Sequence, residues 1–240
     1  MITTVFLGSS TVSGKGQAFD LIGELATRPA NDAFKFSNFG VGGDLAYNVL
    51  QRLPEVVAAH PDKVVIIIGG NDIIASVFEN VWRIFRITKH LPQRPSPEWF
   101  EANLRSIVRE LKVRTSASIA LASLPQVGED PSSSNPAQAK LNDLYERYGA
   151  IIKRVAEEEH VDYVPLYEIL REQIAASPGA AFTSFRFLPF YRDTLRFFLL
   201  RKTGDEIARL NGWRFHVDGV HLNSRGGTIA ADAIQEFLSK

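Results

Sequence analysis

The sequence predicts an α/β fold, in which a parallel β-sheet is covered by helices on both faces. Short apolar runs rich in β-branched residues alternate with longer segments whose apolar residues recur at helical spacing. The clearest run, Val64–Ile68, consists entirely of β-branched residues, as expected for a central strand buried on both faces. The chain has 240 residues, a length that a single α/β domain can have.

The predicted elements alternate along the chain. The strands are Thr3–Leu7, Phe34–Ser37, Val64–Ile68, Ser118–Ala122 and Val161–Val164. The helices are Gly16–Ala26, Leu45–His60, Asn71–Phe85, Pro97–Val113, Ala137–His160 and Ser224–Leu238. We expect Ser96, Asp44 and Ser224 to cap the helices that begin beside them.

Two stretches do not fit this alternation. Residues 128–136, with the sequence GEDPSSSNP, have the composition of a polar loop. Residues 175–215 form a long interruption before the last predicted helix. Neither a repeat nor a linker divides the chain, so we expect one domain over residues 1–240 with a cap or insertion at about 175–215.

The composition excludes several classes of protein. Lys and Arg number 27 and so do Asp and Glu, so the chain lacks the basic excess of a protein that binds nucleic acid mainly by charge. It has no cysteine, which excludes disulfides, a thiolate nucleophile and cysteine metal sites. The N-terminal segment lacks the basic start and the long apolar run of a signal peptide or membrane span, so we expect a soluble, cytoplasmic protein.

Chemically informative residues follow the predicted strands. The four segments are Gly8-Ser9-Ser10-Thr11, Asn38–Asp44, Gly69-Gly70-Asn71-Asp72 and, before the last helix, Asp218-Gly219-Val220-His221. Ligands of doubly wound sheets bind at the carboxyl ends of the strands. We therefore expect a hydroxyl, a glycine-rich turn, an amide and an Asp/His pair to meet at one edge of the sheet.

These groups are the ones that acyl transfer needs. A serine hydroxyl is a weak nucleophile until a base accepts its proton, which is the expected role of His221 toward Ser10. Asp218 can bind the other ring nitrogen and stabilise the imidazolium. The backbone N–H groups of Ser10 and Gly43 and the side-chain amide of Asn71 can donate to the oxyanion that forms.

With these four segments in order, the chain resembles the GDSL/SGNH hydrolase family of esterases and lipases. The resemblance implies a flavodoxin-like three-layer α/β/α sandwich with a five-stranded parallel sheet in the order 2-1-3-4-5. It also implies that Ser10 is the nucleophile, with Asp218 and His221 completing a triad. The implied oxyanion donors are Ser10, Gly43 and Asn71.

The first segment departs from the family pattern. The family usually has Gly-Asp-Ser-Leu, whereas Ser9 stands here at the aspartate position and Thr11 at the leucine position. Ser9 is thus an alternative nucleophile, but the spacing to Gly14 matches the family only for Ser10.

Other polar residues have simpler interpretations. Gly14-Lys15-Gly16 lacks the third glycine and the acidic partner of a dinucleotide-binding loop. Asp44 and Asp72 are interpreted as capping or supporting residues and His216 as a surface histidine. The three histidines that end or follow predicted helices suit the negative helix terminus; they are His60, His90 and His160. The pattern predicts no metal site and no organic cofactor.

Two segments combine aromatic residues with arginines, namely Trp82–Arg94 and Phe182–Leu200. We interpret them as an apolar cap with a basic rim over Ser10; a homodimer interface and additional core are the alternatives. The candidate substrate-binding residues are Trp82, Phe85, Phe187 and Phe190.

The sequence thus predicts a cofactor-free serine hydrolase that cleaves a small-molecule carboxylic ester, with a hydrophobic acyl or aryl part, through an acyl-enzyme. A carbohydrate O-acetylesterase, a thioesterase and a lysophospholipase are the enzymatic alternatives. An inert binding protein with a hydrolase fold is the non-enzymatic one, and Ser9 is its only support.

Overall fold

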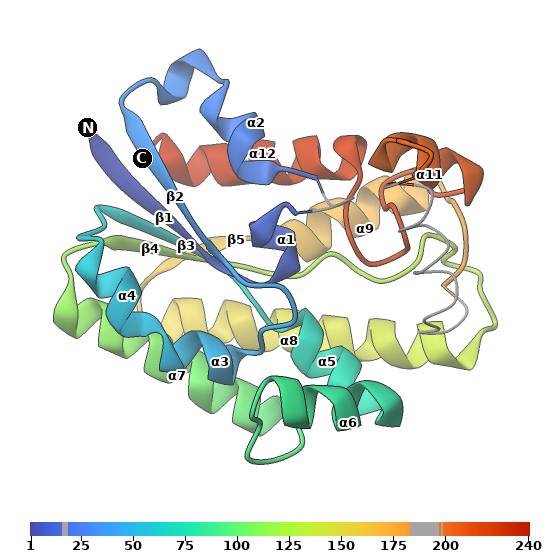
Figure 1. Ribbon diagram of the computed structural model, residues 1–240, viewed down its shortest axis with the longest axis horizontal. Coiled ribbons are helices and arrows are strands. Elements are labelled where there is room, and N and C mark those ends of the chain that lie inside the picture. Colours follow the sequence, from blue (N-terminus) through green and yellow to red (C-terminus); the bar gives the residue numbers. More distant parts are fainter. Residues whose placement is uncertain (16–18, 183–196, 198) are drawn as a thin grey trace.

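The core of the molecule is one parallel sheet with the strand order β2-β1-β3-β4-β5 (Figure 1). The structure is a computed structural model, and it describes residues 1–15, 19–182, 197 and 199–240. The strands are β1 (Ile2–Gly8), β2 (Phe34–Gly40), β3 (Lys63–Ile67), β4 (Ser118–Ala122) and β5 (Asp162–Val164). The α/β class and the strand order implied by the family resemblance are confirmed.

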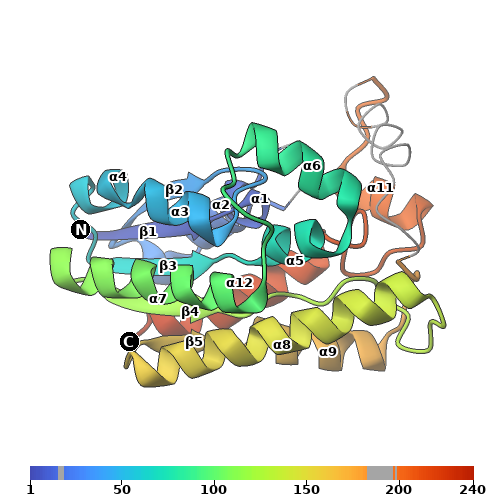
Figure 2. The ribbon, with the colours of Figure 1, turned by 90° about the horizontal axis from the view of Figure 1, so that it is seen from below.

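Helices cover both faces of the sheet (Figures 1 and 2). One face carries α2 (Leu21–Ala26) and α12 (Ser224–Leu238), which pack on each other. The other carries α3 (Ala46–Gln51), α4 (Leu53–Ala58), α7 (Pro97–Arg114) and α8 (Pro136–Glu158). The remaining described helices are α1 (Ser10–Ser13), the 3₁₀ turn η1 (Pro29–Asn31), α5 (Gly70–Val77), α6 (Glu79–Thr88), α9 (Leu166–Ala176) and α11 (Gly204–Leu210).

The central strand explains why the layers hold together. Val64–Ile67 of β3 are buried, and their side chains belong to a core to which helices of both layers contribute. Strand residues that point to opposite faces are therefore both removed from water, which is why the segment has no polar alternation. In the described part of the chain, no helix is both long and apolar enough to cross a membrane.

Two long predicted helices are each divided into two. The segment predicted as Leu45–His60 forms α3 and α4, because Pro54 has no N–H to continue the helical hydrogen bonds across Arg52. The segment predicted as Asn71–Phe85 forms α5 and α6, which are separated by Phe78 in an extended conformation. The predicted helix Gly16–Ala26 begins, among described residues, only at Leu21.

One of the three predicted caps is present. The Ser96 hydroxyl accepts a hydrogen bond from the N–H of Trp99, as expected. The prediction for Asp44 was wrong, because α3 begins at Ala46 and the Asp44 carboxylate binds two cationic side chains instead. The prediction for Ser224 was also wrong, because Asn223 caps α12.

The three histidines expected at helix ends lie there in a left-handed conformation. His60, His90 and His160 have φ values of 46°, 51° and 52° and follow α4, α6 and α8. A left-handed residue after a helix is a frequent terminating feature. These residues thus mark where the chain leaves the helical layers.

The predicted polar loop is confirmed, whereas the long interruption contains helices that were not predicted. Residues 128–135 contain no helix or strand, and α8 begins at Pro136. The interruption contains α11, and α9, which ends in it, was not predicted although Leu166, Leu170 and Ile174 bury one of its faces. Residues 183–196 and 198 lie outside the described residues, so the cap at about 175–215 stays a prediction.

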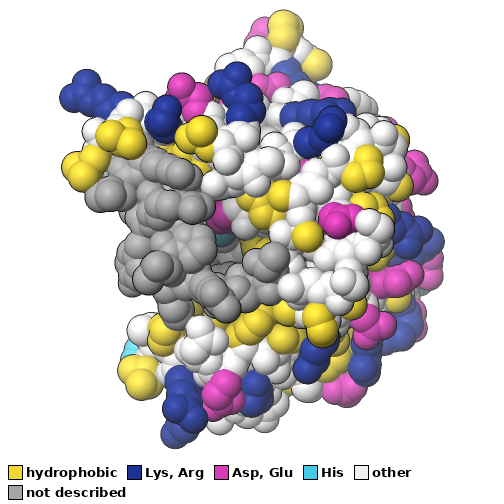
Figure 3. All heavy atoms as spheres, turned by 90° about the vertical axis from the view of Figure 1, so that its right-hand side faces the viewer, with side chains coloured by type: hydrophobic (Ala, Val, Ile, Leu, Met, Phe, Trp, Pro, Cys, Tyr) yellow, Lys and Arg dark blue, Asp and Glu magenta, His cyan; other side chains and the backbone are white. Residues whose placement is uncertain are grey.

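The carboxyl ends of the strands point to the same side of the molecule, which Figure 3 shows face on. Hydrophobic and charged side chains are mixed on this face. In the register of the sheet, Gly8 at the end of β1 pairs with Gly40 of β2 and with Ile67 of β3. The segments that follow these three strands therefore start from the same level.

Candidate active site

The turn after β1 presents Ser10 at the edge of the sheet. Ser9 is the N-cap residue of α1 and Ser10 is the first residue of this one-turn helix. A side chain at Gly8 would overlap the carbonyl oxygen of Ile67, so only glycine lets β1 and β3 approach this closely beneath the turn.

Ser10, His221 and Asp218 form a continuous line of hydrogen bonds. The Ser10 Oγ lies 2.9 Å from Nε2 of His221, and Nδ1 of the same ring lies 2.7 Å from Oδ2 of Asp218. The other oxygen of Asp218 accepts hydrogen bonds from the N–H groups of Val220 and His221. With the Nδ1 proton directed at Asp218, Nε2 is free to accept the proton of Ser10.

The charges of His221 and Asp218 stabilise each other, which favours a protonated imidazole beside an ionised carboxylate. The negative charge of Asp218 raises the pKa of His221 above its ordinary value, and the burial of the ring opposes this effect only partly. Burial acts to raise the pKa of Asp218, but the charge of His221 and the hydrogen bonds outweigh it, so that pKa lies well below its ordinary value. The carboxylate therefore stays ionised beside the imidazole.

The predicted oxyanion donors lie on neighbouring turns. Gly43 has φ +80°, a left-handed conformation that favours glycine. Asn71 is in the first turn of α5, and its Nδ2 donates to the carbonyl oxygen of Asp44 at 2.9 Å. An amide NH₂ group carries a second hydrogen, which the bond to Asp44 leaves for another acceptor.

The Asp44 carboxylate ties these turns together. One of its oxygens accepts from Arg52 Nε at 2.8 Å and the other from Lys89 Nζ at 2.9 Å. Arg52 also donates to the carbonyl oxygen of Gly8, which the N–H of Val41 binds as well. Because the Asp44 side chain is only 6% exposed, its charge needs these two cations.

Asp72 has a supporting position, as expected. It is completely buried, and its Oδ2 accepts from the N–H of Ala46, which links the start of α5 to the start of α3. Burial raises the pKa of Asp72 to about 7, because a carboxylate loses hydration there.

The interpretation of His216 as a surface residue was wrong. Its side chain is fully buried, and Nδ1 lies 2.8 Å from Oε1 of Glu129. Glu129 also accepts from the backbone N–H groups of Arg214, Phe215 and His216 at 2.6–2.7 Å. Burial acts to raise the pKa of Glu129, but His216 and the backbone donors outweigh it and hold that pKa below its ordinary value.

Glu129 is the supporting residue that the sequence did not reveal. It lies in the polar loop after β4 and holds the segment that leads into Asp218 and His221, although its partner His216 is 87 positions away. The only signal was a single glutamate in a loop of serines and prolines, which does not distinguish a buried anchor from a solvated side chain.

Of the four candidate substrate-binding residues, the structure describes two. The ring of Phe85 lies beside Gly43, where a Cβ atom would be 3.8 Å from its Cζ, and it packs against the cluster of Ile74, Ala75 and Val81. Trp82 is half-buried one turn earlier on α6. Phe187 and Phe190 lie outside the described residues.

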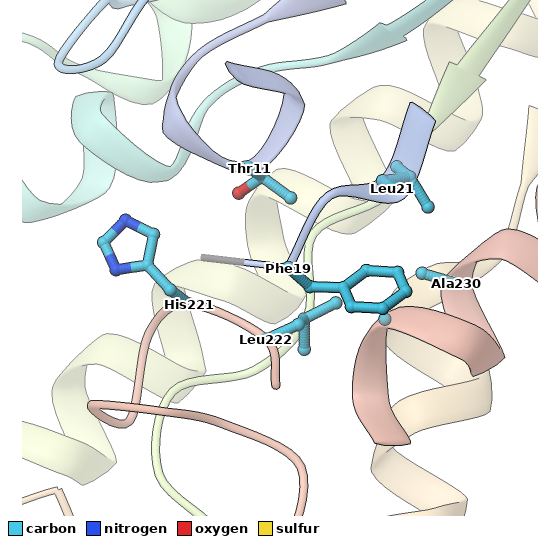
Figure 4. A pocket seen from close by; sticks show the side chains of 7 residues that line it. Thr11, Phe19, Leu21, His221, Leu222 and Ala230 are labelled. Carbon is cyan, nitrogen blue, oxygen red and sulfur yellow. The ribbon is translucent and has the colours of Figure 1, made fainter. Parts of the chain in front are cut away.

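A small apolar cavity lies beside His221 (Figure 4). It is lined by Thr11, Phe19, Leu21, His221, Leu222, Gly227 and Ala230. Its volume of about 10 Å³ is room for about one water molecule or one methyl group. In the described residues, no group of three or more His, Asp or Glu side chains could hold a metal ion.

An α/β sheet with a serine, a histidine and an aspartate joined in that order by hydrogen bonds at its carboxyl edge is typical of a class of hydrolytic enzymes. Residues 6–228 match the model of the GDSL-like Lipase/Acylhydrolase family, and the chain belongs to this family. It is thus an enzyme that hydrolyses ester bonds. No curated protein sequence matches the chain.

Solved structures of related fold include a putative GDSL-like lipase from Parabacteroides merdae. Its sequence identity is 18% and its TM-score is 0.67, and the match covers 98% of this chain and 94% of that chain. The acetyl xylan esterase AlAXEase has 20% identity and a TM-score of 0.64, with 99% of this chain and 100% of that chain covered. Axe2, an acetylxylan esterase from Geobacillus stearothermophilus, has 20% identity and a TM-score of 0.64, with 100% and 94% covered. At these identities the likeness shows the fold alone.

The contacts of Glu129 generate a test. In Glu129→Gln, an NH₂ group replaces one acceptor and faces backbone N–H donors, so we expect the free energy of unfolding to fall by roughly 1–3 kcal/mol. Ester hydrolysis should fall too, because the segment before Asp218 loses its anchor. Urea unfolding and hydrolysis of p-nitrophenyl acetate measure both effects.

The matched control is Asp130→Asn, an acid-to-amide change in the next residue, whose carboxylate accepts from the N–H and hydroxyl of Ser132 at the surface. It should change the free energy of unfolding by less than about 0.5 kcal/mol. Equal behaviour of the two variants would contradict the anchoring role of Glu129.

Proposed function

We propose that the enzyme cleaves carboxylic esters through an acyl-enzyme intermediate on Ser10. The supporting observation is the line of contacts from Ser10 through His221 to Asp218, at 2.9 and 2.7 Å. The Ser10 oxygen attacks the ester carbonyl carbon while His221 takes the hydroxyl proton, and Asp218 stabilises the resulting imidazolium.

The tetrahedral intermediate then collapses. Its negative oxygen accepts hydrogen bonds from the N–H groups of Ser10 and Gly43 and from the Asn71 amide. The C–O bond to the alcohol breaks as His221 returns the proton to the leaving oxygen, which leaves the acyl group on Ser10. A water molecule, deprotonated by His221, attacks that acyl group in the same way, releases the acid and restores Ser10.

Ser10 is a better candidate than Ser9. The Ser10 Oγ is in hydrogen-bond contact with the base, whereas the Ser9 side chain is buried at the N-cap position of α1. The serine at the aspartate position of the family pattern therefore leaves the proposed catalytic contacts intact.

We further propose that the ester has a hydrophobic acyl or aryl part. The support comes from α6, which brings the ring of Phe85 beside Gly43 and leaves Ile84 and Ile87 42% and 73% exposed. Apolar side chains at that exposure on the helix next to the site suit an apolar ligand.

An O-acetyl ester of a carbohydrate is a second candidate. It is favoured by the small volume of the cavity beside His221, which has room for one methyl group and not for a chain. Two of the structures with the same fold are described as acetylxylan esterases.

Covalent labelling tests the assignment of Ser10. A fluorophosphonate probe should modify the wild-type protein and Ser9→Ala, and it should leave Ser10→Ala unlabelled, because only Ser10 is activated by His221. Mass spectrometry of the labelled peptide identifies the site. A folded wild-type protein that takes up no label would refute the acyl-enzyme mechanism, and labelling of Ser10→Ala at Ser9 would refute the choice of serine.

The pH dependence tests the role of the His221–Asp218 pair. His221 must be neutral to accept a proton and its pKa is raised, so kcat/KM should rise with pH around a midpoint above the ordinary value of about 6.5. In Asp218→Asn the raising charge is absent, so the midpoint should move to lower pH while the maximal rate falls by roughly 10³–10⁴-fold.

Asp232→Asn provides the control for this change, because Asp232 is an exposed carboxylate paired with Arg28. It should keep both the midpoint and the rate of the wild type. An unchanged midpoint in Asp218→Asn would contradict the assigned pair.

Chain length discriminates between the two substrate classes. For p-nitrophenyl esters from acetate to octanoate we expect kcat/KM to rise by up to about fourfold per buried methylene, since each contributes about 0.8 kcal/mol. Phe85→Ala should flatten this rise, whereas Val113→Ala, an exposed position on α7, should not. A maximum at acetate would reject the hydrophobic acyl group and support the O-acetyl ester.

A further inference from the structure

Lys89, which follows α6, reaches the turn that carries the proposed oxyanion donor Gly43. Its Nζ donates a hydrogen bond of 2.6 Å to the carbonyl oxygen of Gly42 and binds Oδ1 of Asp44 at 2.9 Å. The sequence places this lysine in the segment Trp82–Arg94 but gives no sign of its contact with the glycine turn. Its ammonium group thus holds both sides of Gly43.

The contact with Gly42 acts on the same peptide group that supplies the Gly43 N–H. In a trans peptide the C=O of one residue and the N–H of the next point in opposite directions across one planar unit, and the chain has no cis peptide bond among its described residues. Fixing the Gly42 oxygen toward Lys89 therefore fixes the direction of the Gly43 N–H.

A cation on the carbonyl oxygen also changes the strength of the donor. Hydrogen bonds in series polarise one another, so a charged donor on the C=O side makes the N–H a better donor on the other side. This gain applies when negative charge develops on the substrate oxygen, which is the moment at which it lowers the barrier.

The lysine is held in place from three directions. Asn48 of α3 donates to its carbonyl oxygen at 2.8 Å, and Asp44 holds the ammonium group. Its stem lies against Gly43, where a Cβ atom would be only 2.8 Å from Cε of Lys89. The side chain is 19% exposed, so water screens these contacts only in part.

The paired Asp44 limits what the lysine can do at longer range. A carboxylate and an ammonium in contact cancel much of each other's distant field, and Arg52 adds a second cation on the same carboxylate. The effect on the oxyanion must therefore pass mainly through the hydrogen-bonded Gly42–Gly43 peptide.

We propose that Lys89 is a positioning residue of the oxyanion hole, which orients and polarises the Gly42–Gly43 peptide so that the Gly43 N–H stabilises the tetrahedral intermediate. This inference rests on the proposed acyl-enzyme mechanism. It assigns to α6 a part in catalysis that is independent of the substrate contacts expected of Phe85.

The test compares Lys89→Met, which keeps the length of the stem and removes the charge, with Lys89→Arg, which keeps the charge. Arg114→Met is the control, because Arg114 is a 41% exposed cation at the end of α7 that pairs with Glu110 and belongs to neither segment proposed to contact the substrate. In Lys89→Met we expect kcat for p-nitrophenyl acetate to fall by roughly 10–100-fold, less than or equal to the loss of a complete oxyanion donor. KM should change by less than about threefold.

A second readout examines the oxyanion directly. A trifluoromethyl ketone labelled with ¹³C at the carbonyl reacts with the Ser10 hydroxyl, whose proton passes to His221, and forms a hemiketal with a negative oxygen. The ¹³C shift followed against pH gives the pKa of that oxygen. It should be higher by about one unit in Lys89→Met, equivalent to a tenfold weaker stabilisation of the anion, and unchanged in Lys89→Arg and Arg114→Met.

Folding is checked by circular dichroism and urea unfolding. Asp44 stays paired with Arg52 in Lys89→Met, so no unpaired buried charge is created and the variant should fold. If it does not, Lys89→Gln, an uncharged donor, replaces it and should give the same direction of change.

The outcomes separate the two proposals. A folded Lys89→Met with wild-type kcat, or with a lower kcat but an unchanged hemiketal pKa, overturns the role of Lys89 while the acyl-enzyme mechanism stands. A wild-type protein that neither hydrolyses the ester nor forms the hemiketal overturns the proposed mechanism and the role of Lys89 with it. A reduced kcat with a raised hemiketal pKa, restored by Lys89→Arg, supports the inference.

Discussion

The register of three parallel strands is the constraint on which the rest of the site depends. Gly8 pairs with both Gly40 and Ile67, so the turns after β1, β2 and β3 all begin at one level of the sheet. Because each turn is short, the side chain or backbone group that it offers stays close to that edge. A shift of one strand along its neighbour would move its turn by about 3.3 Å per residue and separate the groups.

Two buried carboxylates then fix the loops that the sheet leaves free. Asp44 holds the glycine turn through Arg52 and Lys89, and Glu129 holds the segment before Asp218 through backbone N–H groups and His216. Burying a charge is costly unless it is paired and hydrogen-bonded, and both groups meet that condition. The same low exposure makes each loop sensitive to the loss of one partner.

The proposed chemistry divides between these supports. The segment held by Glu129 leads to the base, and the turn held by Asp44 carries an oxyanion donor and orients Asn71 through its carbonyl oxygen. Helix α6 and the residue that follows it support the second of these parts, since Phe85 lies beside Gly43 and Lys89 holds the peptide that precedes it. Proton transfer and anion stabilisation thus depend on separate elements that meet at Ser10.

Much of the fold and of the candidate site follows from local patterns in the sequence. The strands of the sheet agree with expectation, because the spacing of apolar residues distinguishes strands from helices. The contact of Ser10 with His221 also agrees, because the chain direction shows where each strand has its carboxyl end. Where local signals compete, the prediction fails: Pro54 divides a helix whose apolar period continues through it. His216 shows the same limit, since a polar residue near a loop gives no sign of burial.

By itself, then, the sequence determined which residue types follow each strand. It thereby determined the class of chemistry that is available at the carboxyl edge of the sheet. Only the tertiary structure decided which of them is the partner of which. Asp44 is 45 positions from Lys89, and Glu129 is 87 from His216. Such pairs leave no periodic trace in the sequence, because the contact forms only when the layers pack and the charges are removed from water together.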